Sequence, residues 1–242
     1  MMGANPCKDG VMQAPGSREN LAIRGYELLK RDIIRGVFAP GEKLLMSALK
    51  ARYQLGVGPL REALSQLVAE RLVVAISQRG FRVASMSLAE LADIYDARAH
   101  LEGLIVGLAI ARGDDAWEAQ ILAQAHSLAK VVAVKDGEEM LSLWDARHQA
   151  FHAAIAAGCG SPHLLQVRAA LFDQAERYRH LWLQQTVFSA AALQAKREEH
   201  AALVEAILQR DSERACTLIR EHLLGPVSII GELLQARQAS AE

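Results

Sequence analysis

Hydrophobic and polar positions follow two different periods in the first third of the chain. Apolar side chains recur at helical spacing in residues 20–35, and shorter helical segments follow at 47–54 and 57–70. Short strands are predicted at 72–75 and 80–84, with the tip of a hairpin at 77–79. Three helices followed by a hairpin indicate a winged helix-turn-helix, in which the third helix enters the major groove of DNA.

The remaining two thirds of the chain show helical periodicity only. Ser87 and Glu90 have the spacing of a capping box, and Ser161 precedes a proline at the first helical position. Helices are predicted at 87–112, 115–134, 137–157, 161–185, 189–209 and 212–235, the last bent or broken at Gly225 and Pro226. The predicted fold is therefore mainly α: an N-terminal winged helix-turn-helix and a C-terminal antiparallel bundle of six or seven helices.

Composition and charge support a division into a tail (1–17), a DNA-binding domain (18–84) and an acidic helical domain (85–242). Residues 18–84 hold 12 basic and 6 acidic side chains, whereas residues 85–242 hold 14 basic and 21 acidic ones. This asymmetry suits a basic head that binds nucleic acid. No run of 18 apolar residues or signal-peptide core is present, and the three scattered cysteines suit a reduced compartment, so we expect a cytoplasmic protein.

The predicted DNA contacts lie on the second and third helices and at the wing tip. Arg61 is expected to reach a base or a phosphate, the second helix to hold phosphates, and the exposed methyl groups of the third helix to meet thymine. For each arginine, plain solvation or a salt bridge is the alternative. The candidate contacts are Lys50, Arg52, Gly56, Val57, Gly58, Leu60, Arg61, Arg79 and Gly80.

These segments resemble the GntR family of bacterial transcription regulators. The residues 40–44 (PGEKL), 49–64 and 79–83 (RGFRV) match the family pattern of a PGxxL turn, a helix-turn-helix and an RGxxV wing. Gly56, Val57 and Gly58 occupy positions where the family usually has Ser, Arg and Thr. Glycine is acceptable as a helix N-cap, so the fold should persist while the preferred DNA sequence differs.

Four histidines of the C-terminal part could converge on one metal ion. His148 and His152 are four residues apart and share a helix face, while His200 and His222 come from two later helices. Imidazole suits Zn²⁺, Ni²⁺ and other transition metals. From spacing alone, surface histidines or hydrogen-bonded core histidines remain the alternative.

A second resemblance, to the FCD effector domains of the FadR branch of GntR regulators, bears on these histidines. Its motifs are matched by Phe151-His152, Glu199-His200 and His222-Leu223, with His148 at the family's aspartate position. The resemblance implies a divalent metal, and four nitrogen ligands favour zinc, or nickel, over manganese. It also implies that Arg98 faces a central cavity, where a guanidinium can clamp a carboxylate. The alternative for Arg98 is an ion pair with Glu102. Tyr178 is a further candidate contact of the effector, and its alternative role is simple core packing.

The combined expectation is a homodimeric repressor that binds an operator in double-stranded DNA and releases it when a small carboxylate binds. Three longer phrases, at 56–64, 147–152 and 157–161, resemble a family member that represses genes of glutarate catabolism. That resemblance alone implies glutarate or a related five-carbon dicarboxylate. Two alternatives stay open: a metal-dependent hydrolase using the four histidines, and a DNA-binding activator without an effector.

Overall fold

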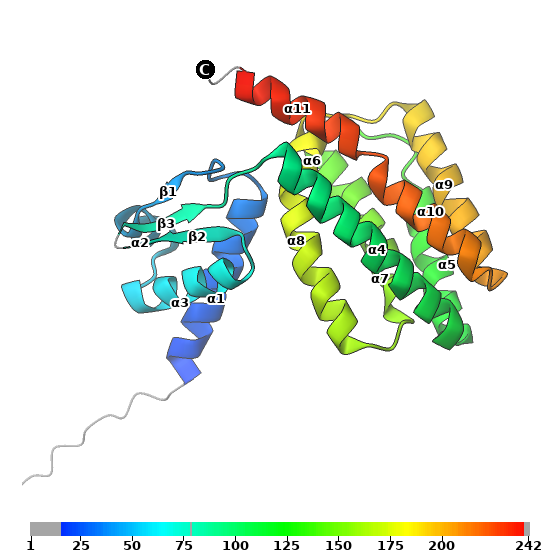
Figure 1. Cartoon of the computed structure of the whole chain (residues 1–242), viewed down its shortest axis with the longest axis horizontal. Coiled ribbons are helices and arrows are strands. Elements are labelled where there is room, and N and C mark those ends of the chain that lie inside the picture. Colours follow the sequence, from blue (N-terminus) through cyan, green and yellow to red (C-terminus); the bar gives the residue numbers. More distant parts are fainter. Residues whose placement is uncertain (1–15, 78, 240–242) are drawn as a thin grey trace, which may run out of the picture. The chain divides into compact units, whose positions relative to one another are not determined.

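The structure, a computed structural model, describes residues 16–77 and 79–239 (Figure 1). The described residues form two compact units, one of residues up to Asp32 with Glu42–Ala84, the other of Ile33–Gly41 with the residues from Ser85 onward. The predicted tail falls largely on residues 1–15, outside the described part. The first helix, α1 (Gly16–Ile34), begins two residues inside the predicted tail.

The smaller unit contains most of α1, then β1 (Lys43–Leu44), α2 (Met46–Tyr53), α3 (Val57–Ala69), β2 (Val73–Ile76) and β3 (Gly80–Val83). The three strands form an antiparallel sheet in the order β1-β3-β2, in which Leu44 pairs with Phe81 and Val73 with Val83. Strand β1 was not predicted, because two residues are too few to show an alternating pattern. The arrangement is the predicted winged helix-turn-helix.

The position of α3 follows from its apolar stripe. Leu60, Ala63, Leu64 and Leu67 have the spacing of one helix face and are completely buried. Burying each leucine side chain contributes about 1.5–3 kcal/mol to folding. The turn before α3 starts at Gln54, which adopts a left-handed conformation (φ 54°) that ends α2. The buried stripe fixes which face of α3 remains available to solvent.

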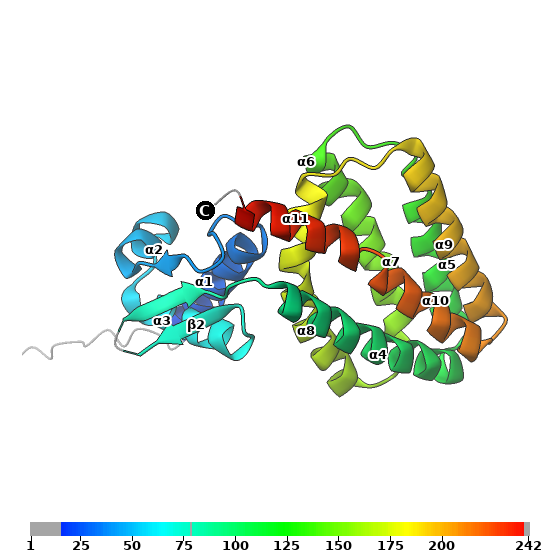
Figure 2. The same cartoon turned by 45° about the horizontal axis from the view of Figure 1, so that its top comes forward.

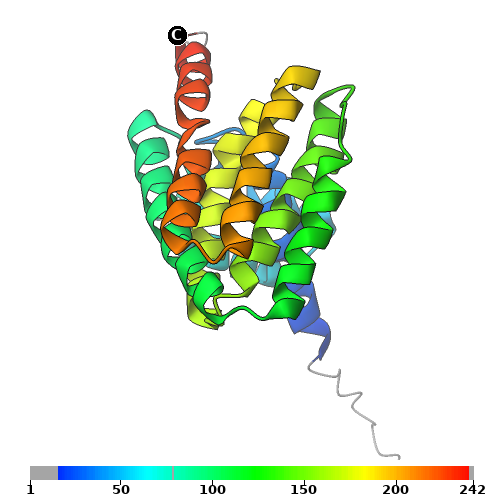
Figure 3. The same ribbon diagram turned by 90° about the vertical axis from the view of Figure 1, so that its right-hand side faces the viewer.

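The larger unit is an all-helical bundle (Figures 2 and 3). Helix α4 packs against α8 and α10, α5 packs against α7 and α9, and α9 packs against α10. This architecture confirms the predicted mainly α fold. The helices are α4 (Leu88–Arg112), α5 (Asp115–Ala129), α6 (Gly137–Glu139), α7 (Ala146–Ala157), α8 (Pro162–Gln184), α9 (Ala190–Leu208), α10 (Ser212–Leu224) and α11 (Val227–Ala239).

Two helices differ from their predicted extent. Helix α5 ends at Ala129 and not at Val134, because the following valine-rich segment leaves the helix and buries Val131 and Val134 in the core. The predicted helix 137–157 is interrupted by a π-helical turn, Met140–Asp145, between α6 and α7. The predicted break at Gly225 and Pro226 is present between α10 and α11.

Trp117 closes one end of the bundle against two glycines. Its indole nitrogen donates to the carbonyl groups of Ala154 and Ile155 at the end of α7. A Cβ atom on Gly113 or Gly158 would lie 2.0 or 2.5 Å from the indole ring, so the ring occupies space that only glycine leaves open. Within the described residues, none of the helices combines the length and apolarity needed to cross a lipid bilayer.

Candidate functional site

The histidines predicted as metal ligands lie together inside the bundle. The Nε2 atom of His148 lies 3.0 Å from that of His152 and 3.0 Å from that of His222, and the latter two are 3.2 Å apart. Ligand atoms around a tetrahedral zinc ion, with Zn–N distances of about 2.05 Å, are separated by about 3.3 Å. All four members offer a ligand atom within 4.8 Å of the others: His148, His152, His200 and His222.

The electrostatic state of the histidines suits ligation. The pKa of each of the four histidines is lowered, mainly by burial, and the pKa of His200 falls to about 3. The rings are therefore neutral near pH 7, as metal ligands must be. Nε2 of His200 is buried and has no hydrogen-bond partner in the described part of the chain. Such an unsatisfied atom costs free energy that a bound cation would recover.

A carboxylate orients one of the rings. Nδ1 of His222 donates to Glu199 over 3.1 Å, which leaves the Nε2 lone pair of His222 directed at the other histidines. Glu199 also pairs with Lys196, 2.8 Å away, and these contacts lower the pKa of Glu199 to about 2. Glu199 is therefore an anion at all ordinary pH values, which keeps His222 in the tautomer that binds a metal.

His148 has a different partner on its outer nitrogen. Nη2 of Arg179 lies 3.2 Å from Nδ1 of His148, and a guanidinium can only donate. This contact places the ring proton of His148 on Nε2. If His148 held a metal through Nε2, its ring proton would lie on Nδ1 and would oppose the Arg179 guanidinium. Trp144, stacked on His148 with ring centroids 4.7 Å apart, keeps the imidazole plane in place.

Arg179 belongs to a buried polar network behind His148. Its guanidinium pairs with Asp145 and, at 3.2 Å, with Glu176. Gln149 donates to both of these carboxyl groups, at 2.7 and 2.5 Å. Burial raises the pKa of Glu176, while Arg179 opposes that rise. The π-helical turn that ends at Asp145 brings this carboxylate to Arg179.

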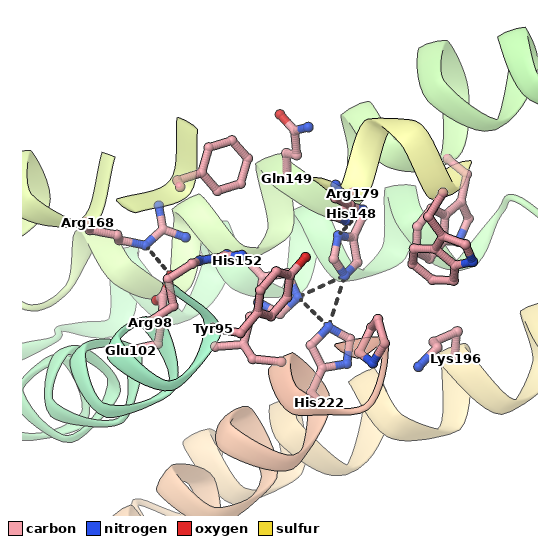
Figure 4. A pocket seen from close by; sticks show the side chains of 15 residues that line it. Tyr95, Arg98, Glu102, His148, Gln149, His152, Arg168, Arg179, Lys196 and His222 are labelled. Atoms are coloured by element: carbon pink, nitrogen blue, oxygen red, sulfur yellow. Dashed lines mark hydrogen bonds and ion pairs between the residues drawn. The ribbon is translucent and has the colours of Figure 1, made fainter. Parts of the chain in front are cut away.

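A cavity of about 50 Å³ extends from the histidines along α4 and α8 (Figure 4). That volume holds about four water molecules, the scale of a small organic acid. Its walls carry an unusual number of charged side chains for a buried space. The charged and polar lining residues are Tyr95, Arg98, Glu102, His148, Gln149, His152, Arg168, Arg179, Lys196 and His222.

Arg98 is the feature of the cavity that most needs explanation. It is 6% exposed, and in the described part of the chain it forms no ion pair or hydrogen bond. Its guanidinium lies over the rings of Tyr95 and Phe172, at 5.5 and 5.4 Å. The expected alternative partner, Glu102, instead pairs with Arg168 over 2.8 Å. Arg98 is thus a buried cation that lines the cavity without an ion-paired carboxylate in the described residues, and Glu102 and Glu176 act on it only at longer range.

The sequence prediction missed Tyr95, Glu102 and Arg168 as lining residues. Tyr95 and Glu102 lie three residues before and four after Arg98, so they share its helix face, and this spacing is visible in the sequence. Arg168 could not be placed in the same way, because the rotation of α8 against α4 depends on packing.

Tyr178, predicted to contact the effector, does not line this cavity, and the structure corrects that prediction. Its hydroxyl group is bonded to the first turn of α4: it donates to Glu90 at 2.5 Å and accepts from the backbone nitrogen of Ser87 at 3.1 Å. Ser87 also caps α4 by accepting from the backbone nitrogen of Glu90. Consecutive helical residues point about 100° apart, so Tyr178 and the neighbouring Arg179 face different surroundings.

In the smaller unit, the start of α3 is open to solvent. Gly56 is the N-cap without a side-chain hydrogen bond, and Val57, Gly58 and Arg61 are exposed. Leu60 is completely buried, so the prediction that its methyl groups reach DNA is wrong. The exposed surface of this first turn consists mainly of backbone, one valine side chain and Arg61.

The other predicted DNA contacts are also exposed. Lys50 lies on α2, and Arg79 and Gly80 lie at the turn into β3, where Gly80 has φ 93°. Arg52 is held by the buried carboxylate of Asp32 at 2.9 Å, and this carboxylate also accepts from Tyr53. Arg52 is therefore fixed in direction while its side chain remains about half exposed.

Comparison with known proteins agrees with both halves of this structure. Residues 23–83 match the model described as bacterial regulatory proteins of the gntR family, and residues 93–225 match the FCD domain. The chain belongs to the GntR family, with an FCD domain. Members of this family are DNA-binding transcription regulators, so the hydrolase alternative is not supported.

Relatives of this GntR regulator span nearly its whole length. It is 59% identical over 213 residues to the HTH-type transcriptional repressor GlaR of Escherichia coli K12, covering 88% of this chain and 97% of that protein. It is 34% identical to the uncharacterized regulator BphR of Paraburkholderia xenovorans, covering 85% and 83%. The solved structure of E. coli McbR/YncC shares the fold, with a TM-score of 0.71, 21% identity, and coverage of 88% and 97%.

Proposed function

We propose that this GntR regulator is a repressor whose operator binding is relieved by a dicarboxylate of about five carbons, such as glutarate. One carboxylate would bind at a metal ion held by His148, His152, His200 and His222, and the other would bind Arg98. The observation that carries the proposal is Arg98 itself, a buried guanidinium that forms no ion pair or hydrogen bond in the described residues. The 59% identity to a transcriptional repressor supports the direction of regulation.

The charges around the cavity support a doubly charged ligand. Four carboxylates line the cavity or pair with its bases and, when ionised, balance the charge of its four bases, although none of them pairs with Arg98. The bases are Arg98, Arg168, Arg179 and Lys196, and the carboxylates are Glu102, Asp145, Glu176 and Glu199. A divalent metal on neutral imidazoles would leave two surplus positive charges in a low-dielectric interior. A dianion restores neutrality, and a monocarboxylate does not.

The donor set fits a borderline transition metal, and zinc is the proposed ion, with nickel as the alternative. When bound, such an ion supplies a Lewis-acidic centre that attracts one ligand carboxylate. The chain's own residues do the rest: Glu199 holds the tautomer of His222, and Arg98 fixes the distant carboxylate in a bidentate contact.

DNA recognition is proposed to use the exposed residues of the smaller unit, in a homodimer that reads a two-fold symmetric operator. Arg61 would reach a base, and the backbone of Gly56 and Gly58 with the methyl groups of Val57 would approach the groove. Lys50, Arg52, Arg79 and Gly80 would hold phosphates. We propose residues 18–84 as the DNA-binding domain and 85–242 as the effector-binding and dimerisation domain, after the tail 1–17.

The direct test is fluorescence anisotropy of zinc-loaded protein on DNA from upstream of its own gene, at one stated salt concentration, with and without glutarate. Salt must be fixed because phosphate contacts make the affinity salt-dependent. Tight, specific binding that glutarate weakens is the expected result. Tight binding that no dicarboxylate of three to six carbons changes would contradict the proposed effector.

Two variants separate the parts of the proposal. Arg98→Met should abolish the response to glutarate while leaving metal content and DNA affinity unchanged, whereas Arg214→Met, at an exposed pair with Glu205, should respond normally. Arg61→Ala should weaken operator binding by about 1–3 kcal/mol per half-site while leaving glutarate binding intact. An Arg98→Met protein that still responds would show that the second carboxylate binds elsewhere.

A further inference from the structure

One tyrosine hydroxyl group in this chain differs from the others. Among the four tyrosines, the hydroxyl groups of Tyr26, Tyr53 and Tyr178 each bond to a carboxylate. The hydroxyl of Tyr95 is buried and has no hydrogen-bond partner in the described part of the chain. Leaving such a group unpaired costs about 1–3 kcal/mol, so its retention in a cavity wall calls for a ligand.

The position of Tyr95 is central to the cavity. It lies one helical turn before Arg98 on α4 and lines the same space as Arg98 and the histidines. In the view of Figure 4, its ring lies between Arg98 and His222, with the hydroxyl group directed toward the histidine cluster. Tyr95 therefore lines the space that a ligand bridging the metal site and Arg98 would occupy.

The chemistry of the site favours Tyr95 as a donor. Burial raises the pKa of the Tyr95 hydroxyl, so it keeps its proton near pH 7. Arg98 and Arg179 lower the pKa of this hydroxyl group, whereas Glu176 and Asp145 raise it, and an anion bound beside the two arginines would accept a charge-assisted hydrogen bond from it. The aromatic ring meanwhile holds the Arg98 guanidinium at 5.5 Å.

We propose that the Tyr95 hydroxyl group binds an oxygen atom of the anionic effector and so contributes to effector selectivity. This inference rests on the proposed function, because it assumes a dicarboxylate in the cavity. Two acceptors fit: an oxygen of the carboxylate nearer the metal, or an oxygen substituent on the adjacent carbon, as in 2-hydroxyglutarate. These two acceptor atoms can be distinguished, because they predict different losses of affinity for glutarate and 2-hydroxyglutarate when the Tyr95 hydroxyl group is removed.

The test is isothermal titration calorimetry of the zinc-loaded full-length chain with glutarate and with 2-hydroxyglutarate. Tyr95→Phe removes only the hydroxyl oxygen and should lower the affinity for at least one ligand about tenfold or more, the usual effect of losing a hydrogen bond to a charged group. Equal losses for both ligands would assign the carboxylate as the acceptor. A larger loss for 2-hydroxyglutarate would assign the 2-hydroxyl group.

Tyr178→Phe is the matched control, since it removes a buried hydroxyl group of the same unit that does not line the cavity. It should bind both ligands within about twofold of wild type. Thermal unfolding without ligand gives an independent readout: Tyr178→Phe should be less stable, because Glu90 loses its partner, whereas Tyr95→Phe should be as stable as wild type or more so. If Tyr95→Phe binds both ligands with wild-type affinity, the role of Tyr95 is refuted and the proposed function is unaffected. Failure of wild-type protein to bind any dicarboxylate would overturn the proposed function as well.

Discussion

Replacing Glu199 with glutamine tests whether the histidine cluster is a metal site. Glu199 accepts from Nδ1 of His222 at 3.1 Å and is the only carboxylate in the described residues that contacts a ring of the cluster. Removing such an orienting carboxylate typically costs 10–100-fold in metal affinity. The amide oxygen of glutamine can still accept from Nδ1, so the loss should be near the lower end, about tenfold or about 1.4 kcal/mol. Glu199→Ala leaves Nδ1 without this partner and should approach the upper end.

The assay is competition for zinc between the protein and a chromophoric chelator at pH 7.5. Glu198→Gln is the matched control, because Glu198 is the neighbouring residue and, among the described residues, its carboxylate accepts only from Gln194. Its zinc affinity should equal that of wild type. An affinity of Glu199→Gln within twofold of wild type, or an equal loss in Glu198→Gln, would refute the role of Glu199.

Three further predictions concern stability. Gly158→Ala places a Cβ atom 2.5 Å from the Trp117 ring and should lower the free energy of unfolding by about 1–3 kcal/mol; a denaturation midpoint equal to wild type would contradict this. Asp32→Asn removes the buried anion that Arg52 and a tyrosine contact and should destabilise the DNA-binding unit by about 1–3 kcal/mol, visible as a lower melting temperature of that unit. In metal-free protein, burial lowers the pKa of His200 from 6.5 to about 3. Between these two pH values the unfolded chain binds more protons than the folded chain, so the free energy of unfolding falls as the pH drops below about 6.5. Urea midpoints measured from pH 7.5 to 5.5 should decrease, and a constant midpoint would be incompatible with neutral buried histidines.

Sequence periodicity predicted the helices and the wing because each of these elements has one apolar face. The buried stripe of α3 from Leu60 to Leu67 is an example. The same stripe explains why Leu60 was wrongly predicted to contact DNA. Its position in the motif indicates only that the residue lies near the start of the recognition helix, whereas the helix face on which it lies determines that its side chain is buried. Periodicity also missed the π-helical turn at Met140–Asp145, because one extra residue per turn leaves no clear signature in six residues.

The histidine set was predictable because residues four apart share a helix face and because the flanking residues resemble a known motif. The remaining cavity wall was harder to predict, since it depends on how α4 and α8 rotate against each other. Arg177, Tyr178 and Arg179 are equivalent in sequence terms, yet only Arg179 lines the cavity. The buried network that selects it, with Asp145 and Glu176, comes from three separate segments of the chain.

The contact between Tyr178 and the first turn of α4 ties α8 to the start of the larger unit. One residue after Tyr178, Arg179 contacts both the cavity and His148. The neighbouring residue on α8, Tyr178, bonds Ser87 and Glu90 through its hydroxyl group. Ser87 is four residues beyond the end of β3, along the covalent connection between the two units. The cavity wall and that connection are therefore joined by two adjacent residues of α8, Arg179 and Tyr178, and by the first turn of α4.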